Sequence, residues 1–135
     1  MGPRHLASSI EPRSLRILVL EDSKDTRDGL CLMLEWRSFA VDTATDAETA
    51  CALPSMGNYD VIIVDLKIPY INGLEVGRVI AQRSPRPLLY AFSACASAPD
   101  REQTKLAGFD RHIAKGSPTS ITELEAAISQ LKSLL

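Results

Sequence analysis

The chain has 135 residues, a length that fits one domain and can bury about two thirds of its unfolded surface without help from disulfides. The formal net charge of -2 argues against a nucleic-acid-binding domain, because such domains carry a basic excess. No apolar run reaches the roughly 18 residues of a membrane span, and the N-terminus lacks the apolar stretch of a secretory signal. We therefore expect a cytoplasmic protein with no membrane insertion.

The cysteines support the same location. Cys31, Cys51 and Cys95 are odd in number and show no CxxC spacing, so they indicate neither a disulfide framework nor a zinc site. We expect all of them to be reduced thiols.

Residues 1–14 mix Gly, Pro, Arg, His and Ser with no period, which predicts a flexible leader ahead of one domain over residues 15–135. After the leader, short aliphatic runs, typical of buried strands, alternate with segments whose apolar residues recur every three or four positions, typical of helices. The elements expected in chain order are a strand at 15–20, a helix ending near 37, a strand at 39–44, a helix from about 46 to 54, a strand at 61–64, a helix around 76–80, a strand at 88–92, a helix from 99 to 108, a strand at 110–114 and a last helix at 121–135.

Local signals refine the ends of these elements. Either Asp22 or Ser23 is expected to cap the first helix, and the Asn-Gly pair at 72–73 is typical of a loop. Trp36 and Phe39 are expected to pack against the end of the first helix.

Strands that alternate with helices predict an α/β fold, in which a parallel sheet is covered by helices on both faces. Right-handed crossovers leave few topologies for five strands, and a (βα)₈ barrel would need many more residues. The chain shows no internal repeat, so we expect a single doubly wound domain.

Polar side chains follow four of the expected strands at the point where each strand ends. Glu21 and Asp22 follow the first strand, Asp65 the third, Ser93 the fourth and Lys115 the fifth. Because ligands bind outside the carboxyl ends of the strands in open parallel sheets, these residues are expected to converge on one site.

The chemistry of this set points to phosphoryl transfer. Clustered carboxylates repel each other unless a cation lies between them, and their hard oxygens suit Mg²⁺. A lysine suits an anion that also touches the metal, and a serine hydroxyl can donate to that anion. An ionised aspartate that attacks phosphorus needs no catalytic base. Each residue alone has a simpler interpretation as a cap, a turn residue or a surface charge, and the combination carries the prediction.

The ends of the expected strands carry the motifs LVLEDS at 18–23, VIIVDLKIPYINGLE at 61–75, FSA at 92–94 and Lys115. In the second motif, Asp65, Pro69 and Gly73 are spaced four residues apart each time. With these motifs the chain resembles the response-regulator receiver domain of two-component signalling, from about residue 16 to residue 135, and the spacing after Asp65 is the most specific feature because it matches the family's phosphoacceptor loop. The resemblance implies a flavodoxin-like, CheY-like sheet of five parallel strands in the order 2-1-3-4-5, with five helices.

The resemblance also implies roles for the acidic residues. Asp65 corresponds to the phosphoacceptor. Asp22 corresponds to a direct ligand of Mg²⁺ (or Mn²⁺), and Glu21 to a residue that assists through water. The backbone carbonyl of Lys67 corresponds to a further metal contact, and the Lys67 side chain, a basic group beside the acids, is expected to tune the lifetime of the phosphoryl group.

Ser93 stands where the family has a hydroxyl residue that closes on the phosphoryl group, and Lys115 where it has a phosphate-binding lysine. Two departures from the family pattern follow. Gly116 replaces the usual proline, which predicts a looser turn or a different peptide isomer. His112 replaces the switch aromatic, and we expect an imidazole switch whose output responds to pH near neutrality.

The resemblance implies a bacterial phosphoprotein that accepts a phosphoryl group from a histidine kinase or a phosphotransfer protein and signals by changing conformation. It would catalyse only its own phosphorylation and dephosphorylation. A homodimer through the face formed by residues 99–108, 110–114 and 121–135 is a further implied arrangement. The alternatives are a pseudo-receiver, which binds proteins independently of phosphorylation, and an aspartyl hydrolase, which the absence of a DxD pair at 65–67 disfavours.

Overall fold

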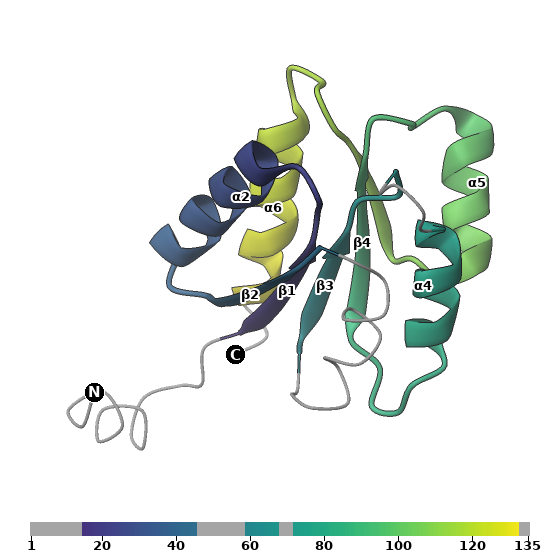
Figure 1. The fold of residues 1–135 in the computed structure, drawn as a ribbon, viewed down its shortest axis with the longest axis horizontal. Coiled ribbons are helices and arrows are strands. Elements are labelled where there is room, and N and C mark those ends of the chain that lie inside the picture. The colour runs from purple at the N-terminus through teal and green to yellow at the C-terminus, as the bar shows by residue number, and fades with distance from the viewer. Residues whose placement is uncertain (1–14, 46–58, 68–71, 133–135) are drawn as a thin grey trace.

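The computed structural model, which describes residues 15–45, 59–67 and 72–132, has one sheet of five parallel strands in the order β2-β1-β3-β4-β5 (Figure 1). The element bounds are β1 (Arg16–Leu20), α2 (Lys24–Trp36), β2 (Ala40–Ala44), β3 (Val61–Val64), α4 (Gly73–Ala81), β4 (Leu88–Ser93), α5 (Ala98–Ala107), β5 (Arg111–Ala114) and α6 (Ser120–Lys132).

The sheet order confirms the CheY-like, doubly wound prediction. Four helices lie within the described residues, whereas five were predicted. The remaining one, expected from about 46 to 54, falls outside the described residues, as does the leader at 1–14. From β1 the chain adds β2 on one side, and from β3 it adds β4 and β5 on the other side. A ligand crevice is expected where the strand order reverses in this way, at the carboxyl ends of β1 and β3.

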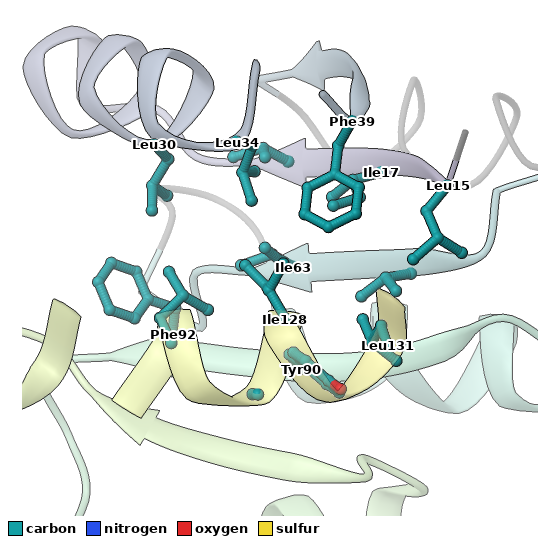
Figure 2. Close-up of a cluster of buried hydrophobic side chains, with 14 of the residues drawn as sticks. Leu15, Ile17, Leu30, Leu34, Phe39, Ile63, Tyr90, Phe92, Ile128 and Leu131 are labelled. Carbon is teal, nitrogen blue, oxygen red and sulfur yellow. The ribbon is translucent and has the colours of Figure 1, made fainter. Parts of the chain in front are cut away.

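Helices cover both faces of the sheet, with α2 and α6 on one face and α4 and α5 on the other (Figure 1). Because strand side chains alternate, Ile17 and Val19 point into the core under α2 and α6, while Leu18 and Leu20 point into the core under α4 and α5. Figure 2 shows the first of these cores, where Ile63 of β3 and Ile128 of α6 lie among aromatic and aliphatic side chains. The double burial explains the continuous aliphatic runs of β1 and β3.

Side-chain caps fix where the helices begin. Ser23, and not Asp22, caps α2, because its hydroxyl accepts from the backbone N–H of Thr26. Asn72 caps α4, so the prediction of a loop at 72–73 was wrong for Gly73, which is the first residue of the helix. A capping box of Ser97 and Asp100 starts α5.

The prediction that Trp36 packs against the end of the first helix was wrong. Phe39 is buried as expected, but Trp36 is 87% exposed. At 3.6 residues per turn, Trp36 lies about 200° around α2 from Leu34, a residue of the buried face. Among the described residues, no helix combines the length and the apolar character that crossing a membrane requires.

Candidate functional site

The three acidic residues meet at the carboxyl ends of β1 and β3. Hydrogen bonding of the sheet continues one residue past each strand, since the N–H of Glu21 donates to Ala44 and the N–H of Asp65 donates to Leu20. Carboxylate oxygens of Glu21, Asp22 and Asp65 all lie within 4.8 Å of one another. Residues 44 positions apart in sequence thus form one acidic cluster, because β1 and β3 are neighbours.

Lys115, which directly follows β5, completes the cluster from the far side of β4. Its Nζ donates to Glu21 Oε1 at 2.7 Å and to Asp65 Oδ2 at 3.1 Å. Its backbone N–H donates to the carbonyl of Ser93 at 2.8 Å, so the pairing of β4 with β5 extends to the site. Two of the three carboxylates, those of Glu21 and Asp65, pair with the Lys115 ammonium, and the negative charge that remains suits a divalent cation with hard oxygen ligands.

Burial and charge shift the pKa values of the central pair. Burial raises the pKa of Glu21 above its ordinary value, the neighbouring Asp65 adds to the rise, and the hydrogen bond from Lys115 opposes it. Burial acts to lower the pKa of Lys115, but its hydrogen bonds to Glu21 and Asp65 outweigh burial, and the net pKa is raised. Lys115 is therefore held as a cation beside the two buried acids.

The backbone after Asp65 is held close to the site. The N–H of Lys67 donates to Asp65 Oδ1 at 3.0 Å, so both carboxylate oxygens of Asp65 have hydrogen-bond donors. A side chain at Gly73 would place its Cβ 2.7 Å from the Cα of Leu66, which explains the need for glycine in the motif. Pro69 lies outside the described residues.

Ser93 is fully buried at the end of β4, between the strands that carry Asp65 and Lys115. Its hydroxyl accepts from the N–H of Cys95 at 3.1 Å. The carbonyl of Cys95 in turn accepts from His112 Nε2 at 2.9 Å. His112 is thus linked through Cys95 to the hydroxyl at the site.

His112 is half-buried and has partners on both ring nitrogens. Its Nδ1 lies 3.0 Å from Thr104 Oγ1, and its backbone carbonyl accepts from Arg101 Nη1 at 2.7 Å. Burial lowers the pKa of His112, the charge of Arg101 lowers it further, and the carbonyl of Cys95 and the charge of Asp100 act in the opposite sense.

The lowered pKa of His112 predicts that acid destabilises the fold through this residue. Between the lowered pKa of the folded protein and the ordinary value near 6.5, the unfolded chain binds more protons at residue 112 than the folded protein does. The contribution of neutral His112 to the free energy of unfolding is therefore fully present above this pH window and is lost as pH falls through it. Urea unfolding between about pH 7.5 and pH 5 should show a shrinking difference in unfolding free energy between wild type and His112→Gln, with a slope below about 1.4 kcal/mol per pH unit. His5 is present in both proteins and cancels. A difference that does not vary with pH would contradict the prediction.

The turn after Lys115 has a backbone conformation that excludes the proline of the family pattern. Gly116 has φ of 81°, which the proline ring cannot adopt. Within the described residues the cis peptide bond is Ser84-Pro85, so the peptide between Lys115 and Gly116 is trans.

Two arginines of the site were not predicted. Arg101 holds the loop after β4 by donating to the carbonyls of Ala96 and His112. Arg27 donates to the carbonyls of Glu21 and Asp22. Their roles depend on side chains that reach back to backbone carbonyls, and neither belongs to a motif.

Comparison with known proteins identifies the family. The family model for the response regulator receiver domain matches residues 17–129. The chain belongs to this family. It is 34% identical over 100 residues to the transcriptional regulatory protein ResD of Bacillus subtilis, covering 74% of this chain and 41% of ResD. It is 30% identical over 120 residues to the sensor protein EvgS of Escherichia coli, covering 89% of this chain and 10% of EvgS. The chain thus spans less than half the length of these two relatives.

A solved receiver structure supports the same assignment. The response regulator TrrA of Thermotoga maritima, in complex with Mg²⁺-BeF, superposes with a TM-score of 0.74 and 29% identity, covering 87% of this chain and 98% of that one. The family match, the order of the five strands and the acidic cluster at their carboxyl ends thus all support the assignment of a receiver domain.

Proposed function

We propose that this receiver domain accepts a phosphoryl group on Asp65 and holds it as an acyl phosphate. The observation that carries the proposal is the convergence of Glu21, Asp22, Asp65 and Lys115 from three strand ends on one cluster. A purely structural ion pair would need one acid for one lysine, whereas this cluster keeps an excess of acid in a partly buried site, at a cost in stability.

In the proposed reaction, a carboxylate oxygen of Asp65 forms a bond to phosphorus while the phosphorus–nitrogen bond of a phosphohistidine donor breaks. The leaving imidazole keeps the electron pair and takes up a proton. Lys115, already bonded to Asp65 Oδ2, would contact the oxygens of the transferred group. The Ser93 hydroxyl would exchange its contact with the N–H of Cys95 for one with the same oxygens.

Glu21, Asp22, Asp65 and the backbone carbonyl of Lys67 would hold Mg²⁺ (or Mn²⁺), whose preference for hard oxygens fits this donor set. When bound, the ion neutralises charge on the phosphoryl oxygens. TrrA, a relative with bound Mg²⁺-BeF, supports the choice of metal.

His112 is the proposed switch residue. Movement of Ser93 toward the phosphoryl group would release the N–H of Cys95, and the carbonyl of Cys95 is held by the His112 ring. The loop after β4 and the imidazole would therefore shift together between two conformations.

A histidine kinase or a phosphotransfer protein is the proposed donor, and the face formed by α5, β5 and α6 is a proposed dimer interface. We propose no direct binding to nucleic acid and a cytoplasmic location, which the free thiols of Cys31 and Cys95 support. Cys51 lies outside the described residues.

Intact-protein mass after incubation with acetyl phosphate tests the proposal. With Mg²⁺ the protein should gain one phosphoryl group, and with EDTA it should gain none. Reduction of the acyl phosphate with borohydride should convert Asp65 to homoserine, which peptide mapping detects. A folded protein that neither acetyl phosphate nor a cognate kinase labels would contradict the proposal and favour the pseudo-receiver alternative.

A further inference from the structure

Arg27, in the first turns of α2, reaches back to the end of β1. Its Nη1 donates to the carbonyl of Glu21 at 3.1 Å and to the carbonyl of Asp22 at 3.3 Å. Its own backbone N–H donates to the carbonyl of Ser23, the N-cap residue. Two contacts of its guanidinium and one of its backbone thus let the half-buried Arg27 join the helix to three successive residues of the corner between β1 and α2.

This corner carries Asp22, the one acid of the cluster whose carboxylate accepts no hydrogen bond from the described part of the chain that would hold it in place. The Glu21 carboxylate accepts from Ser23 N–H and from Lys115, and the Asp65 carboxylate accepts from Lys67 N–H and from Lys115. The described residues give the exposed Asp22 carboxylate no comparable hydrogen bond. The position of that carboxylate therefore follows from the backbone of the corner.

We propose that Arg27 is a positioning residue for the acidic metal site: by holding the carbonyls of Glu21 and Asp22, it sets the direction in which Asp22 presents its carboxylate to a divalent cation. The inference rests on the metal site of the proposed function. Residues that orient ligands without touching the metal commonly have large effects on affinity.

The charge of Arg27 works against this effect. A guanidinium near the site repels a divalent cation, so loss of charge alone would strengthen metal binding, whereas loss of the two carbonyl contacts would weaken it. Charge effects at partly exposed positions are screened and small. We therefore expect the contacts to dominate, and the sign of the change separates the two roles.

Lys24 is the matched control. It lies in the same turn of α2 and carries the same charge, but its side chain is 77% exposed and pairs with Asp28 at 2.6 Å, not with the corner. Lys24→Met removes one positive charge from this end of the helix and leaves the carbonyls of Glu21 and Asp22 bonded to Arg27.

The experiment titrates Mg²⁺ into the metal-free full chain and follows the amide resonances of residues 21–23 and 65–67 by NMR. Arg27→Met should weaken Mg²⁺ binding, raising the dissociation constant about tenfold. Lys24→Met should change it by less than about threefold, toward tighter binding. Arg27→Lys, which keeps the charge and cannot reproduce both contacts, should fall between wild type and Arg27→Met, and it carries the test if Arg27→Met does not fold.

Two outcomes overturn the proposal in different ways. If Arg27→Met folds and binds Mg²⁺ as tightly as wild type or more tightly, Arg27 has no positioning role although the metal site stands. If wild type shows no saturable Mg²⁺ binding that Asp22→Asn removes, the metal site of the proposed function fails as well.

Discussion

Replacing Asp65 with asparagine should give a folded protein that acetyl phosphate no longer labels. The amide retains the shape of the side chain but lacks the ionised oxygen that would attack phosphorus. Glu21 cannot replace it, because its carboxylate is held in place by the hydrogen bonds that it accepts from Ser23 and Lys115. Lys115 cannot replace it either, because it is held as a cation and has no free electron pair to attack phosphorus. Intact mass in saturating Mg²⁺ should show no phosphoryl adduct.

Asp28→Asn is the control for this loss of labelling. Asp28 is an exposed aspartate of α2 that pairs with Lys24 away from the cluster, so its variant should be labelled like wild type. In the metal-free state Asp65→Asn should be at least as stable as wild type in urea, because one of the mutually repelling carboxylates is gone. Persistent labelling of Asp65→Asn would place the phosphoryl group on another residue.

Gly77→Ala should destabilise the protein by about 3 kcal/mol, the upper range for an overpacked core. A Cβ at Gly77 of α4 would lie 2.2 Å from Cε1 and 2.5 Å from Cζ of Phe109, a buried ring between α5 and β5. Because the contact is with a packed ring, α4 would have to move away from the sheet. Urea unfolding should show a lower midpoint with an unchanged slope.

Gly29→Ala provides the opposite expectation at a matched position. Gly29 also lies inside a helix, α2, but a Cβ there meets nothing within 4 Å. Alanine should therefore stabilise the protein by about 0.5–1 kcal/mol through helix propensity. Similar effects of the two substitutions would show that backbone propensity, and not the contact with Phe109, decides the cost at Gly77.

The fold was predictable because the three central strands, β1, β3 and β4, are buried on both faces and the ends of several helices carry distinct signals. β1 and β3 read as uninterrupted aliphatic runs, and α5 is bounded by a proline near its start and by Gly108, which adopts φ of 104° at its end. The strand order came from the resemblance to receivers, since hydrophobic patterns do not encode which strands are neighbours.

The sequence was less informative about side chains near the surface. Trp36 was expected to pack because tryptophan usually does, yet its place on α2 turns it to solvent. Ile121 continues the apolar stripe of α6 but is 49% exposed, because it lies in the first turn, at the rim of the core.

For the candidate site, residues at strand ends were predictable and residues that act from helices were not. Glu21, Asp22, Asp65 and Lys115 all come directly after the ends of strands, so the parallel topology alone brings them together. Arg27 reaches the site by a side-chain path that no sequence pattern reports.

The ion pair between Lys115 and Glu21 joins residues 94 positions apart. Closure of so long a loop is entropically costly until the intervening strands are in place, so we expect this contact to form late in folding. The lysine follows β5, which is an edge strand and the last strand of the sheet in chain order. A half-folded chain would hold its acids without their counter-charge, so the proposed phosphoryl transfer to Asp65 would depend on completion of the fold.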